Sequence, residues 1–153
     1  FIAWIDNDPD GAAHWVKSAH AKFQARDFAG AITAADQALA ATPGDADLWT
    51  LHGSANAGLG NSAGAETDFL RALRLDARNL AACRQLDLLY AAQKRYADAV
   101  SVWDFRLKFV PTDGESWHAL GSALMREDEK HKARKAYQAA CERGYKPACG
   151  AAN

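Results

Sequence analysis

Apolar residues recur along the chain at the three- and four-residue spacing of amphipathic helices, and turn residues interrupt this pattern at regular intervals. Residues 14–24 carry Trp15, Ala19 and Phe23 on one helical face, and a second apolar stripe follows a polar turn and covers 28–41. Pro43 then ends the second segment, because proline lacks an N–H and disfavours helix in the residue before it. The pattern predicts two helices joined by a short turn.

This helix–turn–helix pattern returns at a fixed interval of 34 residues, the distance from Pro9 to Pro43. Pro111 follows at twice that interval, and the later turns fall at 58–62, 94–95 and 127–130. A period between ~20 and 50 residues is the sequence signature of a solenoid. We therefore predict four repeats, preceded by the end of another repeat or a capping helix and followed by the start of a C-terminal capping helix. The predicted boundaries are 1–11, 12–45, 46–79, 80–113, 114–145 and 146–153.

Composition narrows the class of protein. The chain has 153 residues, of which 49% are hydrophobic and 24% charged, so it is long and apolar enough to fold. The formal net charge of −1 gives no reason to expect nucleic acid as a partner. No apolar run approaches the ~20 residues that span a bilayer, so we expect no direct membrane insertion. The chain opens on Phe1 inside an apolar pattern, and we expect it to be part of a longer polypeptide.

Large and small residues also keep the 34-residue interval. Tryptophan follows proline by six residues at Trp15, Trp49 and Trp117, and Cys83 replaces it in the third repeat. Together with the small residues at two further positions, this pattern resembles the tetratricopeptide repeat, a helix–turn–helix unit of the same length. The resemblance implies an all-α, right-handed solenoid of four antiparallel helix pairs, a superhelix. Its small residues are Ala19, Gly53, Gly121, Ala38, Ala72 and Ala140.

The same resemblance implies a partner-binding groove, lined by the first helix of each repeat, that takes a protein or peptide. Family members that grip a chaperone's C-terminal carboxylate use lysine, asparagine and arginine at two positions of the first helix. At these positions in the first three repeats, where this chain has Val16, His20, Thr50, Ser54, Arg84 and Leu88, only Arg84 matches. Arg84 either holds an acidic group of a partner or pairs with Asp47 or Glu115 on the surface. The residues expected to line the groove are Val16, His20, Phe23, Thr50, Ser54, Arg84, Leu88, His118, Ser122, Met125 and Arg126.

The third repeat places Asp87 and Arg106 at the two positions where the other repeats have small residues. A buried charge without a partner costs several kcal/mol, so we predict that these two side chains pair with each other. The alternative is a slight splay of the two helices that lets each charge reach water.

The C-terminal stretch departs from the repeat in another way. Cys141 and Cys149 flank a turn with Gly144 and Pro147. This stretch resembles the Sel1-like relatives of the tetratricopeptide repeat, in which cysteines at this spacing can tie a second helix to the following first helix. A bridge would imply an oxidising compartment. The alternative is that these cysteines, like Cys83, are simply small buried residues.

Signals for catalysis or metal binding are weak. The glycine-rich stretch 58–64 has neither the lysine nor the preceding strand of a phosphate-binding loop, and the five histidines lack metal-ligand spacing. We expect no enzymatic activity, no cofactor and no metal. The favoured function is a protein-interaction scaffold, with assembly of a bacterial envelope complex as one setting and the periplasm or cytoplasm as location. The alternative is a structural domain that forms homo-oligomers through exposed repeat ends such as the apolar residues 1–5.

Overall fold

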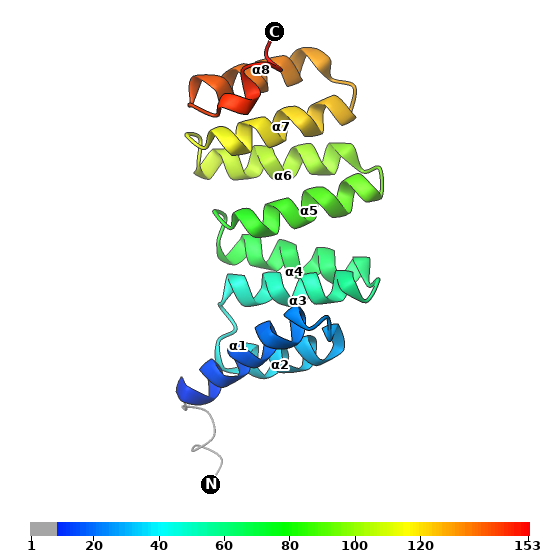
Figure 1. Cartoon of the computed structure of the whole chain (residues 1–153), viewed down its shortest axis with the longest axis vertical. Helices are drawn as coiled ribbons and strands as arrows, with labels where there is room; N and C mark the ends of the chain where they lie inside the picture. The colour runs from blue at the N-terminus through cyan, green and yellow to red at the C-terminus, as the bar shows by residue number, and fades with distance from the viewer. Residues whose placement is uncertain (1–8) are drawn as a thin grey trace. The chain divides into compact units, whose positions relative to one another are not determined.

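Residues 9–153, described by a computed structural model, form eight α-helices and one short 3-10 helix, with no β-strand among them (Figure 1). The all-helical fold class is confirmed. The expected apolar end at 1–5 lies outside the described residues, as does most of the segment 1–11. The α-helices are α1 (Pro9–Gln24), α2 (Phe28–Ala41), α3 (Ala46–Gly58), α4 (Ser62–Leu75), α5 (Leu80–Ala92), α6 (Tyr96–Phe109), α7 (Gly114–Arg126) and α8 (Lys130–Glu142), and the 3-10 helix η1 is Lys146–Ala148.

The chain divides into two compact units, Phe1–Ala82 and Cys83–Asn153. Helices α1 to α4 belong to the first unit and α6 to α8 to the second, while α5 begins just before the boundary and lies mostly in the second unit. Within the first unit α1 packs on α2 and α3 on α4, and α2 contacts α3. Within the second unit α7 packs against both α6 and α8. Each unit thus buries the apolar faces of consecutive helices against one another.

The turn inside each helix pair depends on one residue with a left-handed backbone. These residues are Arg26, Gly60, Lys94 and Asp128, with φ of 61°, 80°, 58° and 65°, and they are spaced by the repeat length. Only the glycine adopts this conformation without steric cost from a Cβ atom. After two of these turns, a side chain caps the next helix: Asp27 accepts a hydrogen bond from the N–H of Gly30, and Asn61 accepts one from the N–H of Gly64.

The recurrent proline and tryptophan are joined by a hydrogen bond. The indole Nε1–H of Trp49 donates to the carbonyl oxygen of Pro43 over 2.9 Å, and that of Trp117 donates to Pro111 over the same distance. The spacing of six residues lets the indole reach back from its helix to the proline carbonyl in the turn before that helix. Pro9 lies at the start of α1, which begins before the predicted segment 14–24, whereas Pro43 follows the end of α2. Proline is tolerated in the first turn of a helix, where its missing N–H has no partner to lose.

The small residues make room for aromatic rings. A Cβ atom on Gly53 would lie 2.8 Å from the ring of Phe69, and one on Gly121 would lie 2.6 Å from the ring of Tyr137. Both distances are shorter than real Cβ contacts, so the ring of the second helix rests directly on the backbone of the first. Alanines complete the packing in the first unit, where Ala19, Ala35 and Ala38 are fully buried.

The predicted pair of Asp87 with Arg106 is wrong. Arg106 instead donates from Nε to the hydroxyl of Ser116 over 2.8 Å and from Nη2 to the Asp113 carboxylate over 3.1 Å. Asp87 accepts a 2.6 Å hydrogen bond from Nη2 of Arg126. Both charges are paired, as burial requires, but each finds its partner on or next to α7 rather than across its own helix pair.

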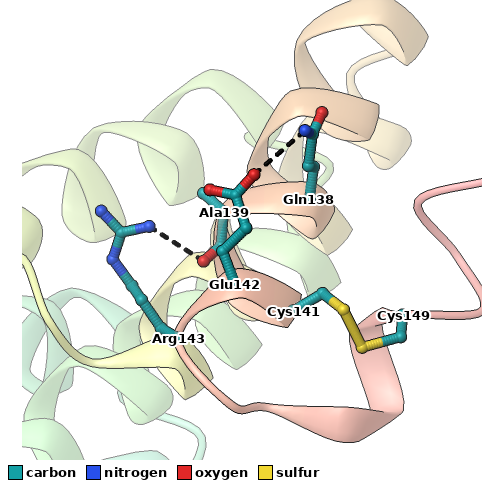
Figure 2. Close-up of a disulfide and its surroundings, with 6 residues drawn as sticks. All are labelled: Gln138, Ala139, Cys141, Glu142, Arg143 and Cys149. Atoms are coloured by element: carbon teal, nitrogen blue, oxygen red, sulfur yellow. Dashed lines mark hydrogen bonds between the residues drawn. A yellow bond between two sulfur atoms is a disulfide. The ribbon is translucent and has the colours of Figure 1, made fainter.

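The C-terminal cysteines form a disulfide, shown in Figure 2, with their Cα atoms 4.9 Å apart. The bond joins the last turn of α8 to the residue that follows η1, while Cys83 is a free, buried thiol. Arg143, between the two cysteines, donates to the carbonyl oxygens of Ala139 over 2.9 Å and of Pro111 over 2.8 Å. The disulfide and these hydrogen bonds hold the C-terminal segment against α8 and the turn that precedes α7.

Candidate partner-binding surface

The residues expected to line a groove fall on α1, α3, α5 and α7, the first helices of the four pairs. Those in the first unit are largely used in its own packing. Val16 and Phe23 of α1 pack against the hydrophobic cluster around Ala35 and Leu48. Among the groove residues of this unit, only the side chain of His20 is exposed.

Hydrogen bonds hold the two α3 residues of the predicted groove. The hydroxyl of Thr50, which is 8% exposed, donates to the carbonyl of Ala46 and accepts from Nδ2 of Asn79. Ser54 donates its hydroxyl to the carbonyl of Thr50 over 2.9 Å. Asn79 also caps the start of α5, where its side chain accepts from the N–H of Ala82. These polar side chains therefore stabilise helix contacts and offer little to a partner.

In the second unit, two ion pairs join α5 to α7. Arg84 of α5 contacts Glu115 of α7, and Asp87 of α5 contacts Arg126 of α7 at 2.6 Å. Because the partners are three residues apart on α5 and eleven apart on α7, the pairs hold the two helices together at separate points. This part of the second unit therefore presents two first helices whose side-chain positions are tied to each other.

Two apolar side chains remain exposed beside these ion pairs. Leu88 of α5 is 63% exposed and follows Asp87 in the chain, and Met125 of α7 is 45% exposed and precedes Arg126. Exposed leucine and methionine on adjoining helices are suited to contact an apolar partner side chain. We call Arg84, Leu88, Ser122, Met125 and Arg126, together with His118, the α5–α7 surface.

The other side chains of the α5–α7 surface are fixed by contacts within the chain. The ring of His118 packs between two tyrosines, with ring centroids 5.4 Å from Tyr137 and 5.1 Å from Tyr145. The hydroxyl of Ser122 donates to the carbonyl of His118 and lies 3.3 Å from the hydroxyl of Tyr137. A partner would therefore meet a surface that is already ordered.

Arg84 does not stand free for a partner carboxylate, because its guanidinium pairs with Glu115. Of the two roles left open by the sequence, the structure shows the pairing within the chain. With the Arg84 side chain 53% exposed and that of Glu115 38% exposed, such a pair contributes about 1 kcal/mol or less. Asp47, the other residue considered as a partner of Arg84, accepts a hydrogen bond from Asn79.

A partly buried polar network in the first unit was not predicted from the sequence. His52 of α3 lies with Nδ1 2.7 Å from the carboxylate of Asp68 on α4 and with Nε2 3.1 Å from that of Asp36 on α2. Nδ2 of Asn56 donates to the same oxygen of Asp68 over 2.8 Å. The sequence does contain a signal, because Asp36 and Asp68 each lie 16 residues from His52. Metal-ligand spacing does not include such a pattern.

This network raises the pKa of His52 above its usual 6.5. The hydrogen bond with Asp68 is the largest cause, and the charges of Asp68 and Asp36 add to it, while burial acts in the opposite direction. His52 therefore links three helices through a bond that strengthens when its ring is protonated.

Two further kinds of site are absent from the described residues. Across 9–153, no cluster of histidine, cysteine and acidic side chains is arranged to hold a metal ion. Nor is any helix in this range long and apolar enough to cross a membrane.

Helix pairs repeated at a fixed interval, with exposed apolar residues on their first helices, define a class of helical-repeat scaffolds for protein interaction. The chain belongs to the tetratricopeptide repeat family. Sequence models of the tetratricopeptide repeat match residues 16–79 and 114–143. No curated protein matches the chain.

Solved structures show the same fold at low sequence identity. A crystal structure of MamA has 20% identity and a TM-score of 0.74, covering 92% of this chain and 82% of the MamA chain. YrrB, described as a TPR protein with an unusual peptide-binding site, has 18% identity and a TM-score of 0.65, with coverage of 89% and 70%. The first TPR of Spaghetti (RPAP3), bound to the HSP90 peptide SRMEEVD, has 21% identity and a TM-score of 0.65, with coverage of 79% and 96%. These similarities establish a tetratricopeptide-like solenoid.

Proposed function

We propose that this chain is a scaffold that binds a peptide segment of a partner protein on the α5–α7 surface. The observation that carries the proposal is the exposure of Leu88 and Met125 on two first helices that ion pairs tie together. The peptide complex of the RPAP3 repeat and the peptide-binding site described for YrrB support peptides as the class of ligand. The proposal assigns no reaction to the chain.

The shape of the contact follows from the residues on this surface. Leu88 and Met125 offer apolar area, and the side chains around them already have their hydrogen-bond and ionic partners. A partner gains most by placing an apolar side chain there, since breaking an existing ion pair would cost part of the binding energy. We therefore propose that binding depends on apolar contact at Leu88 and Met125 more than on the charge of Arg84.

We propose an oxidising compartment as the place where this partner is met. The Cys141–Cys149 disulfide supports this setting, because such bonds persist mainly outside the reducing cytosol. The earlier expectation of a role in assembling an envelope complex is compatible with it and stays a proposal.

The test uses peptides selected from a displayed random library against the whole chain. We expect Leu88→Glu and Met125→Glu each to weaken the selected peptides at least tenfold, because a charge would be placed in an apolar contact. The matched control is Leu75→Glu, since Leu75 is also an exposed leucine, at 46%, but lies at the end of α4 in the first unit. Circular dichroism and thermal unfolding confirm that the variants stay folded.

The α5–α7 assignment would be overturned by peptides whose affinity is unchanged in Leu88→Glu and Met125→Glu. It would also be overturned if Leu75→Glu weakened binding as strongly as the two surface variants. Arg84→Glu distinguishes a charged contact from an apolar one. If Arg84 bound a peptide carboxylate, this variant would lose most of its peptide affinity, whereas a contact through Leu88 and Met125 predicts only a small loss of affinity.

A further inference from the structure

The second unit holds a groove that is separate from the α5–α7 surface. It has a volume of about 520 Å³, within the range of small ligand sites, and it is lined by α6, α7 and α8. Its floor comes from α7, where Trp117, Leu120 and Leu124 supply apolar side chains. The walls carry charges, with Asp104 on α6 and Lys135 on α8.

The floor of this groove is fixed before any partner arrives. Leu120 and Leu124 are only 5% and 6% exposed. The indole of Trp117 donates to Pro111, and the guanidinium of Arg143 lies 4.9 Å from the centre of its ring. A preformed apolar floor reduces the ordering cost that a binding partner would otherwise meet.

Some of the charged side chains that line the groove have no ion-pair partner within the unit. Nζ of Lys132, on the α8 wall, lies 3.3 Å from Oε1 of Glu129, so these two charges form an ion pair with each other. Among the described residues, no ion pair is formed by Asp104, Glu127 or Lys135. Two carboxylates and one ammonium group of the lining therefore have no ion-pair partner, while the charge of Lys108 acts on Asp104 and the guanidinium of Arg143 lies against Trp117.

Asp104 is the carboxylate best placed to take a partner's charge. Asp104 lies at the exposed edge of the groove, where partial burial raises the pKa of its carboxyl and the nearby charge of Lys108 offsets this only in part. A carboxylate that has lost some of its water and has no ion pair within the chain gains more from an incoming cation than a fully hydrated one does.

We propose that this groove binds a partner peptide segment with at least two large apolar side chains next to a lysine or arginine. The apolar side chains rest on Trp117, Leu120 and Leu124, and the basic side chain pairs with Asp104, with Glu127 adding to the attraction. The segment differs in chemistry from one held at Leu88 and Met125, because a basic residue is part of its recognition. One scaffold thereby offers two surfaces with different requirements.

The proposal is tested with the displayed random-peptide library, by sorting its binders on Asp104→Lys. We expect a class of binders rich in large apolar residues plus lysine or arginine to lose at least tenfold in affinity for this variant. Glu142→Lys is the matched control, since it makes the same change of charge on exposed α8 outside the groove lining. The same peptides should bind Leu88→Glu as they bind the unmodified chain.

A charge exchange gives the decisive comparison. Replacing the basic residue of a selected peptide by glutamate should abolish its binding to the unmodified chain and restore binding to Asp104→Lys. The proposal is overturned if no library binder depends on Asp104, or if Glu142→Lys lowers the affinity of the peptides as much as Asp104→Lys does. It is also overturned if the peptide with glutamate does not bind Asp104→Lys. Binders that depend on Leu88 but not on Asp104 would leave the α5–α7 proposal standing and remove this one.

Discussion

At the scale of single residues, His52 is held between carboxylates from the two neighbouring helices. Its bonds to Asp68 and Asp36 connect α2, α3 and α4 inside the first unit. The carboxylate of Asp68 is buried and also accepts from Asn56, so its bond with His52 has little access to water, whereas the side chain of Asp36 is 60% exposed. A titratable group in this position makes the stability of the unit depend on pH.

We predict that His52→Gln lowers the free energy of unfolding by about 1–3 kcal/mol at pH 6, where the ring is protonated. Because the pKa of His52 is raised in the folded chain, protonation of its ring stabilises the fold. The extra stability is complete below the unfolded-chain value of about 6.5 and is lost as the pH rises through the folded-state pKa. Urea unfolding of both proteins between pH 5.5 and 9 should show the difference shrinking with pH. His20→Gln, at an exposed position, serves as control, and parallel curves for His52→Gln and the original chain would contradict the prediction.

Arg106 provides a second prediction at the residue scale. Its bonds to Asp113 and Ser116 mean that its coupling lies with α7 and not with Asp87. In double-mutant cycles, Arg106→Ala with Asp113→Ala should show a coupling of about 1–3 kcal/mol, and Arg106→Ala with Asp87→Ala less than about 0.5 kcal/mol. Denaturant unfolding of the single and double variants measures both. The reverse order of the two couplings would restore the pair predicted from the sequence.

The bonds of Arg106 also act on Asp113. Burial raises the pKa of the Asp113 carboxyl, but the hydrogen bonds from Ser116 and Arg106 and the Arg106 charge outweigh it, so the pKa lies below its usual 3.8. Its contribution to stability is therefore present at neutral pH and is lost as the pH falls through the folded-state value.

At the scale of helices, the closest contact is between a glycine on a first helix and an aromatic ring on the second. Alanine favours helix over glycine by about 1 kcal/mol, so Gly53→Ala and Gly121→Ala would stabilise an open helix. Here the added Cβ atom would meet Phe69 or Tyr137 below 3.0 Å, and Phe69 is only 1% exposed. The packing effect is the larger of the two because a ring in a filled core cannot move away without opening a void.

We therefore predict that Gly53→Ala and Gly121→Ala each lower the free energy of unfolding by about 1–2 kcal/mol. Gly44→Ala is the matched control, because a Cβ atom there meets nothing within 4 Å and its φ lies outside the left-handed region. That variant should stay within about 0.5 kcal/mol of the original. A gain in stability for Gly53→Ala would show that the helices separate easily at this contact.

At the scale of the whole molecule, stability is expected to be local, because each element contacts mainly its neighbours in the chain. The disulfide closes a short loop, with the two cysteines eight residues apart, at the C-terminal end. In the chain-entropy account, a loop of this size contributes about 2.5 kcal/mol. That contribution belongs to the second unit.

We predict that Cys141→Ser combined with Cys149→Ser lowers stability by about 2 kcal/mol, with the loss confined to the second unit. Hydrogen exchange should accelerate in α7, α8 and the C-terminal segment, while protection of α1 to α4 stays the same. Faster exchange spread evenly over both units would mean that the chain unfolds as one cooperative block. Thiol labelling of the original chain checks that Cys141 and Cys149 are bridged before these comparisons are made.

Unreduced native protein should offer no reactive thiol, and unfolded unreduced protein should offer one, Cys83. This thiol is fully buried, and burial raises its pKa to about 11 despite the opposing charge of Arg106. Recovery of three thiols from unfolded protein that never met a reductant would show that Cys141 and Cys149 are not bridged.

The sequence by itself determined the family, the number of helices and the approximate place of the turns. These properties depend on spacing along the chain, since a helix follows from residues three and four apart and a turn from its own proline, glycine or cap. The interval of 34 residues then repeats the same local solution, which made the pattern visible in four copies. Even the Pro43–Trp49 spacing could be recognised as a rule, although its hydrogen bond could not.

Only the tertiary structure decided which partner each polar side chain takes. Arg106 had candidate acceptors on several helices, and its bonds to Ser116 and Asp113 depend on how α6 lies against α7. In the same way, the burial of Thr50 and the exposure of Leu88 separate two residues that the repeat pattern placed on one predicted surface. The physical reason is that periodicity assigns a residue to a face of its helix, whereas partner and exposure depend on the distance to side chains of other helices, which sequence spacing does not contain.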